Sequence, residues 1–307
     1  MEFLDAFLAS GTRFTTPILL AALGGLLTAW TRDLNVGLEG AMLFGAFFGV
    51  VIGLTTGSWV SAVLLTAVLG AMAGLAFGFL VSVLNVNVFV AGIALNVLGA
   101  GGTVYLLRSW YGVKGTLSGD NVESIPRIDI PVVADIPLVG AILSGQTVLT
   151  YVCWLLVALT ALAVRYSVVV RRLKAAGEHP AALTTAGGSV TRMRILAQVW
   201  CFTLCALAGV QLSLGQLSLF TEGMTSGLGF VALAAVIFSQ GRVLLLAVIS
   251  VVFGLSSAAT VVIPESVAPP QFAQMLPYVL ALIGLIVLAR TSRGTTVRIA
   301  TPSMDAR

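Results

Sequence analysis

The segment that organises this chain is 165–194, which reads RYSVVVRRLKAAGEHPAALTTAGGSVTRMR. It is the longest polar break in an apolar sequence, and it carries six basic residues against the single acid Glu178. A long apolar region precedes the segment and another follows it. Because Lys and Arg accumulate in the cytoplasmic loops of membrane proteins, we expect this segment to be a cytoplasmic loop that joins two membrane-embedded halves.

The composition of the chain indicates a membrane protein. Of its 307 residues, 58% are hydrophobic and only 9% are charged, whereas soluble domains carry roughly 25% charged residues. Most of the apolar surface must therefore be solvated by lipid. The predicted fold class is an all-α polytopic membrane protein with one transmembrane domain. The net charge of +4 is interpreted as a topology signal, and no nucleic-acid partner is expected.

Nine apolar runs have a length suited to crossing a bilayer, which takes about 17–25 residues. The first half, about 14–164, holds five of them, and the second half, about 195–290, holds four; a tail follows over 291–307. The predicted spans are 14–30, 37–56, 59–83, 87–107, 147–164, 195–214, 225–240, 243–263 and 275–290.

Loop charges predict an N-out/C-in topology. The 165–194 loop has a charge of +5 (six bases, one acid), and the tail from Arg290 to Arg307 has +3 (four bases, one acid). Both are expected in the cytoplasm, which agrees with the four spans between them. The 108–146 loop, with three bases and four acids, then falls outside, as does the N-terminus. We expect a small amphipathic or extended piece within 108–146.

Glycine spacing predicts closely packed helices. Small residues four positions apart let membrane helices approach closely, and we interpret the pattern as packing within the chain rather than as a dimer motif. The pair Cys201 and Cys205 is likewise interpreted as small packing residues rather than a metal or redox site. The spaced glycines are Gly45, Gly49, Gly53 and Gly57, in one span and at its end, and Gly70, Gly74 and Gly78 in the next span.

Two glutamates stand in matching contexts, LEGAMLFGAF around Glu39 and TEGMTSGLGFVAL around Glu222. In the predicted topology the first lies at the inner end of its span and the second at the outer end, which is the pattern of inverted-repeat halves. A carboxylate in the membrane indicates a functional site, but it could equally cap the N-terminus of the following helix. Both interpretations stay open.

Polar amides in or beside the spans are further candidates. Such groups commonly form hydrogen bonds between helices, and the alternative is contact with a permeant molecule. The candidate residues of a translocation pathway are Asn35, Glu39, Asn87, Asn96, Gln211, Gln216 and Glu222.

Enzymatic motifs are absent from the sequence. It has no Gly-x-x-x-x-Gly-Lys-[Ser/Thr] phosphate loop, no Gly-x-Ser-x-Gly and no His-Glu-x-x-His, and His179 is its single histidine. We therefore predict no catalytic residue, no metal site and no cofactor in this chain.

Four segments resemble the permease subunits of bacterial ABC importers: 35–46, 88–99, 175–194 and 212–239. The similarity extends from about Leu20 to Arg290 and is greatest to the simple-sugar and nucleoside branch, within a wider group of ribose and branched-chain amino-acid permeases. This resemblance implies import of nucleosides or simple sugars across the bacterial cell membrane. It further implies a second permease subunit, a cytoplasmic ATPase subunit that uses ATP and Mg²⁺, and an extracellular binding lipoprotein. The chain departs from the family at Ala41, where Gln is common, and it shows no additional N-terminal span.

The positions of proline and glycine in the 165–194 loop predict a short docking helix. Pro180 suits the first turn of a helix, Gly187 or Gly188 suits its end, and Ser189 can cap the helix that follows. The alternative is a solvated loop that only obeys the positive-inside rule. The family's loop pattern matches at Gly177, Pro180, Ala181, Ala182, Ala186 and Gly187, and the predicted ATPase-coupling residues are these six with Glu178 and His179.

Two other functions are compatible with these observations. One is a secondary transporter driven by an ion gradient, with Glu39 or Glu222 as its proton or sodium site. The other is an ABC permease for branched-chain amino acids.

Overall fold

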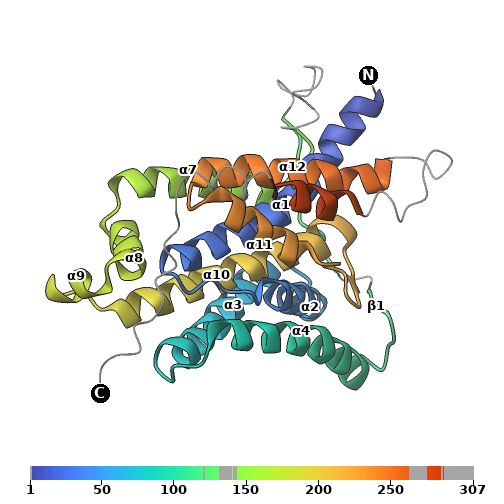
Figure 1. Cartoon of the computed structure of the whole chain (residues 1–307). Coiled ribbons are helices and arrows are strands. Elements are labelled where there is room, and N and C mark those ends of the chain that lie inside the picture. Colours follow the sequence, from blue (N-terminus) through green and yellow to red (C-terminus); the bar gives the residue numbers. More distant parts are fainter. Residues whose placement is uncertain are drawn as a thin grey trace.

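Three apolar helices form the centre of the computed structural model: α1 (Glu2–Trp30), α2 (Leu38–Thr56) and α10 (Val190–Leu212) (Figure 1). They are the most buried of the long helices. The structure describes residues 2–119, 122–130, 140, 144–262, 275–284 and 286. The surrounding helices are α3 (Trp59–Ser82), α4 (Val88–Tyr111), α7 (Val148–Tyr166), α11 (Leu228–Ser239) and α12 (Val243–Val262).

The predicted all-α polytopic class is confirmed. Seven of the helices in the described residues are long and apolar enough to cross a membrane. The other two predicted spans correspond to the shorter apolar helices Leu228–Ser239 and Met275–Gly284. The number of crossings stays a prediction. Residues 285 and 287–290 of the ninth span, residues 264–274 between the last two predicted spans, and the 291–307 tail lie outside the described residues.

The first span was predicted too short. Helix α1 begins at Glu2 rather than near residue 14, and it includes Gly11, Thr12 and Arg13. The Thr12 and Thr16 hydroxyls donate to the carbonyls of Leu8 and Thr12, so these polar side chains are satisfied within the helix itself. Hydropathy alone could not show this local compensation.

The spaced glycines of α2 and α3 both face α10. A Cβ on Gly45 would lie 2.3 Å from the Ala206 carbonyl oxygen, and a Cβ on Gly74 would lie 2.6 Å from the Gln198 carbonyl oxygen. The close helix approach predicted from the spacing is therefore confirmed. Gly57 has a different role, because it ends α2 in the left-handed conformation at φ 64°.

The structure gathers the predicted inner and outer segments at opposite ends of the bundle. At one end, Gly177 contacts Trp30, and Arg194 pairs with Asp33. At the other end, two short antiparallel pairs form, and they include the extended pieces expected within 108–146. These pairs are β1 (Thr116–Leu117) with β4 (Phe220–Thr221), and β2 (Arg127–Ile128) with β3 (Gln146–Thr147). The orientation in the membrane stays a prediction.

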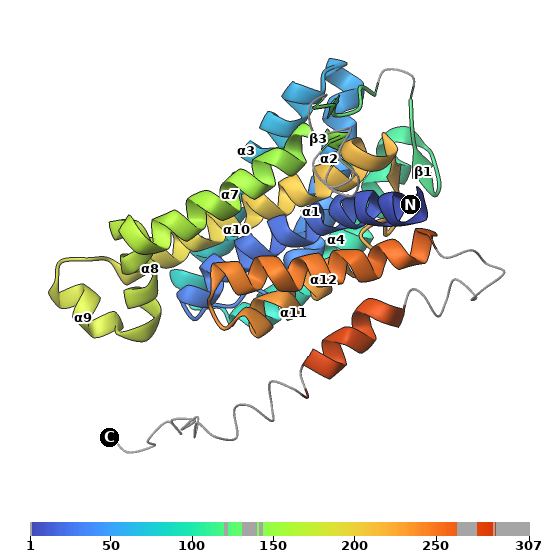
Figure 2. The same ribbon diagram turned by 90° about the horizontal axis from the view of Figure 1, so that it is seen from above.

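The polar segment 165–194 is largely helical. It contains α8 (Val168–Glu178), which the sequence analysis did not predict, and α9 (Pro180–Thr185). Figures 1 and 2 show α8 at the end of the bundle, with α9 projecting beyond it. The pattern of Val170, Leu173 and Ala176, all buried on one face of α8, is the helical periodicity that could have revealed it.

Candidate functional site

Helix α9 begins and ends where Pro180 and Gly187 predicted. Pro180 occupies its first turn, Ala186 ends it, and Gly187 follows in the left-handed conformation at φ 78°. The Gly188 amide donates to the Leu183 carbonyl over 2.9 Å, which satisfies a carbonyl of the last turn. Ser189 then caps α10, because its Oγ accepts from the Arg192 amide.

Helix α9 exposes nearly all of its surface. Within it only Leu183 is buried. Seven of the eight predicted coupling residues are exposed, whereas Gly177 is buried in α8. Gly177 therefore lies beneath the exposed surface, and its part in coupling to the ATPase stays a prediction. The exposed residues are Glu178, His179, Pro180, Ala181, Ala182, Ala186 and Gly187.

Helix α8 is attached to the end of α1. A Cβ on Gly177 would lie 2.2 Å from the Trp30 carbonyl oxygen, so only glycine permits this approach. The Lys174 Nζ lies 4.9 Å from the centre of the Trp30 ring, and the Trp30 Nε1 donates to the Gly241 carbonyl over 3.0 Å. Trp30 thus connects α8 with the turn between α11 and α12.

An ion pair adds a second connection at the same end. The Arg194 Nε lies 2.9 Å from the Asp33 Oδ2. Burial raises the pKa of the Asp33 carboxyl, and the charge of Arg194 partly opposes that shift. The Asp33 carbonyl also accepts from the Gln198 Nε2, so the start of α10 is joined to the segment between α1 and α2.

The segment 31–37 enters the bundle without helical structure. The Asn35 Nδ2 donates to the Gln198 Oε1 over 3.1 Å, and the Asn35 Oδ1 accepts from the Gly37 amide over 2.7 Å. Asn96 of α4 bonds on both sides of the same break, because it donates to the Val36 carbonyl and accepts from the Gly40 amide. Two predicted pathway residues, Asn35 and Asn96, therefore satisfy the backbone here.

Glu39, the second residue of α2, caps a different helix. Its carboxylate accepts from the Thr225 hydroxyl, from the Gly227 amide over 2.9 Å and from the Gly229 amide over 2.7 Å. These donors surround the N-terminus of α11, where a carboxylate stabilises the helix dipole. The N-terminus of α2 lies alongside, since a Cβ on Gly229 would be 2.5 Å from the Glu39 Cα. We call Glu39 with these two helix N-termini the Glu39 junction.

Because α11 is short, the Glu39 junction lies inside the bundle. Its 12 residues extend about 18 Å, whereas the hydrocarbon core is about 30 Å thick. Its C-terminal end reaches the turn at Gly241, which contacts Trp30. Its N-terminus therefore ends part-way through the bundle, as in the discontinuous helices of transporters.

Glu222 does not correspond to Glu39 in position. It lies six residues before α11, where its Oε1 accepts from the Gly115 amide over 3.2 Å and pairs with Arg108 at 3.4 Å. Turns at Gly223 and Gly227, with φ of 68° and 84°, separate it from the helix. The interpretation that both Glu-Gly pairs open a helix is therefore wrong for Glu222, although an inverted relation between the halves stays a prediction.

The other predicted pathway residues are dispersed. Asn87 caps α4 by accepting from the Phe89 amide, and it is exposed. Gln211 accepts from the Thr147 hydroxyl near the opposite end of the bundle. Gln216 donates to the Arg13 carbonyl over 3.0 Å. The seven candidates therefore do not converge on one cavity, and in the described residues no three metal-binding side chains cluster.

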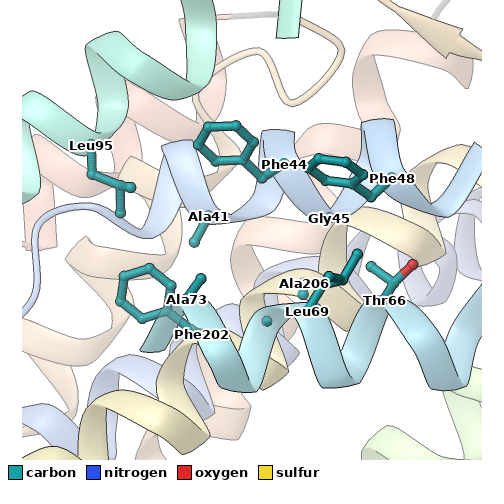
Figure 3. A pocket seen from close by; sticks show the side chains of 11 residues that line it. Ala41, Phe44, Gly45, Phe48, Thr66, Leu69, Ala73, Leu95, Phe202 and Ala206 are labelled. Carbon is teal, nitrogen blue, oxygen red and sulfur yellow. The ribbon is translucent and has the colours of Figure 1, made fainter. Parts of the chain in front are cut away.

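An apolar pocket of about 240 Å³ lies between α2, α3, α4 and α10 (Figure 3). Phe44, Phe48 and Phe202 form its aromatic walls. The Thr66 hydroxyl is buried here and has no hydrogen-bond partner among the described residues. Ala41, where the sequence departs from the family pattern, also lines the pocket. The sequence analysis missed this pocket, although Phe44 and Phe48 have the four-residue spacing of one helix face.

Comparison with known proteins identifies the chain's family. Residues 7–289 match the family model described as "Branched-chain amino acid transport system / permease component". The chain belongs to this permease family. The predicted resemblance is thereby confirmed, and the protein is a multi-pass membrane permease of the ABC-transporter class.

The relatives of this permease carry nucleoside and sugar names. It is 31% identical to a nucleoside ABC transporter permease of Lactococcus lactis, with 92% of each chain covered. It is 27% identical to a guanosine ABC transporter permease of Bacillus subtilis, over 93% of this chain and 92% of that protein. A Haloferax volcanii protein provisionally named a glucose ABC transporter permease is 31% identical, over 84% of this chain and 78% of its own. No solved structure matches the permease significantly.

These comparisons do not favour the alternatives left open by the sequence. The named relatives are ABC permeases, which is not the class of a transporter driven by an ion gradient. Their names refer to nucleosides and a sugar rather than to amino acids.

Proposed function

We propose that this permease imports nucleosides, or else simple sugars, across the bacterial cytoplasmic membrane with energy from a separate ATPase subunit. The observation that carries the proposal is the exposed, small-faced helix α9, bounded by Pro180 and Gly187 at the predicted cytoplasmic end. Small side chains such as Ala181 and Ala182 suit insertion into a cleft of a partner. The complete transporter would also contain a second permease subunit and an extracellular binding lipoprotein.

The contacts of α8 support a route for coupling. Motion of α9 would move α8, whose Gly177 and Lys174 contact Trp30 at the end of α1. The Asp33–Arg194 pair links the same region to the non-helical segment before α2. Displacement of α8 would thus reach the Glu39 junction, and the two halves would alternate access around it.

The apolar pocket is the proposed contact for the permeant molecule. Its aromatic walls at Phe44, Phe48 and Phe202 offer stacking surfaces for a planar base, and the Thr66 hydroxyl is free to bond a polar edge. A simple sugar has no planar base to stack on these aromatic walls. The pocket therefore favours nucleosides over sugars.

The decisive experiment is uptake by the complete transporter in proteoliposomes containing ATP, with labelled guanosine, uridine and ribose as probes. Ala182→Arg should leave the amount of folded protein unchanged and abolish ATP-dependent uptake, because a long charged side chain prevents insertion of α9 into a cleft. Gln240→Arg adds the same charge to an exposed turn at the same end and serves as the matched control. Full uptake by Ala182→Arg would refute the docking role, and exclusive uptake of ribose would refute the nucleoside assignment.

A further inference from the structure

A second apolar groove, of about 330 Å³, opens between α1, α7, α8 and α10 near the predicted cytoplasmic end. Its walls are almost entirely aliphatic and aromatic, and they include Leu27, Leu159, Leu173 and Trp200. Trp200 is 49% exposed, and aromatic residues of this kind gather at the membrane–water interface. The groove does not share lining residues with the pocket assigned to the permeant molecule.

Two arginines flank the groove on the side of the polar segment. Three residues of α8 line the groove, Val169, Val170 and Leu173. Around a helix of 3.6 residues per turn, their mean direction lies about 105° from Arg172 and about 155° from Arg171. Arg192 precedes the groove-lining Leu196 by one turn of α10 and therefore shares its face. Arg172 and Arg192 are both exposed, and neither forms an ion pair within the described part of the chain.

Neighbouring side chains do not neutralise the charges of Arg172 and Arg192. Glu178, the one acid of the segment 165–194, lies about 180° from Val169 around α8. Arg194 is paired with Asp33, and Lys174 lies over the Trp30 ring. Two free cations therefore flank one end of an apolar groove.

Helix α8 itself has the features of an interfacial helix. Val168 and Val169 are 51% and 47% exposed next to the basic positions, while Val170 and Leu173 are buried against the bundle. Exposed valines beside arginines suit the boundary between acyl chains and headgroups, where amphipathic helices lie in the plane of the membrane.

We propose that this groove binds an anionic phospholipid, with an acyl chain between α7, α8 and α10 and the phosphate on Arg172 and Arg192. A free anion would leave the apolar groove without a role, and an uncharged lipid would leave the two cations unpaired. Basic pockets between membrane helices on the cytoplasmic side bind such headgroups. Because α8 carries α9, the bound lipid would hold the coupling helix in position.

The test is lipid retention by the full-length permease, measured by native mass spectrometry after extraction from nanodiscs of phosphatidylcholine with increasing phosphatidylglycerol. Wild-type protein should retain phosphatidylglycerol in preference to phosphatidylcholine. Arg172→Gln and Arg192→Gln should each weaken this preference about fivefold. Arg171→Gln, the matched control on the same helix, should change it less than twofold. Ala163→Phe, which fills the groove without changing charge, should also reduce retention.

Three results would overturn the proposal. Equal retention of the two lipids by the wild type would exclude an anionic-lipid site. Equal loss in Arg171→Gln and Arg172→Gln would mean that the helix attracts anions without a defined site. Displacement of the lipid by millimolar inorganic phosphate, with normal retention in Ala163→Phe, would mean that the arginines bind a free anion and that the groove is unused.

Discussion

The Glu39 junction and helix α9 are both polar interruptions of an apolar chain, but their surroundings are opposite. At the junction, every described contact of the Glu39 carboxylate is made to the α11 region, and the side chain is only 8% exposed. Around α9, the side chains other than Leu183 are exposed. The comparison shows that a buried carboxylate can use its hydrogen bonds to stabilise the fold, whereas small uncharged residues on an exposed helix remain available for a partner.

The largest effect on stability is expected from Glu39→Ala. The substitution leaves the Thr225 hydroxyl and the amides of Gly227 and Gly229 without their acceptor. Each unsatisfied buried donor costs about 1–3 kcal/mol, so a loss of at least ~3 kcal/mol is expected in unfolding experiments in detergent micelles. Glu222→Ala, which removes a partly exposed ion pair, should cost at most about 1 kcal/mol. Comparable losses in the two variants would remove the distinction between a structural and a peripheral glutamate.

A smaller effect is expected from Gly177→Ala. The new methyl group would clash with the Trp30 carbonyl oxygen. Such overpacking lowers the free energy of unfolding by about 1–3 kcal/mol. Gly101→Ala is the matched control, because a Cβ there meets nothing within 4 Å, and replacing a mid-helix glycine should stabilise by about 0.5–1 kcal/mol. Thermal unfolding of both variants measures the difference. A neutral Gly177→Ala would show that α8 is not held against α1.

The smallest effect of the three is expected from Arg194→Gln. The half-buried Asp33 then loses its partner, and the expected loss is about 1 kcal/mol at pH 7. Arg194 lowers the pKa of Asp33 while burial raises it, so the variant should have a still higher Asp33 pKa in the folded state. The folded variant then binds the proton more tightly, so the loss should be greatest above that pKa and should shrink as the pH falls through it toward the folded-state pKa of the wild type, which burial already holds above the ordinary value of about 3.9.

The pH dependence of Arg194→Gln is measured by denaturant unfolding between pH 4 and pH 8, with Arg171→Gln as the control. Arg171 is exposed and forms no ion pair in the described residues, so its replacement should change stability by less than about 0.5 kcal/mol. Identical pH profiles for the two variants would contradict a linking role for the Asp33–Arg194 pair.

Local rules of the chain predicted the fold class and the bounds of helix α9. Apolar length, glycine spacing and the Pro180 and Gly187 boundaries each depend on backbone geometry or solvation within one segment, and the structure confirms them. The 14–30 span was too short because threonine hydroxyls bond to their own helix. Helix α8 was missed because its basic residues obscured an apolar face formed by Val170 and Leu173.

The sequence by itself therefore determined which segments are apolar enough to cross a membrane, where helices come close, and where a short helix interrupts the polar segment. Only the tertiary structure decided the roles of the polar side chains. Glu39 caps a helix that begins 189 residues later in the chain, and Asn96 satisfies a backbone break 60 residues before it. Hydrogen bonds across such separations depend on which helices pack together, and that information is not contained in the residues on either side of the glutamate.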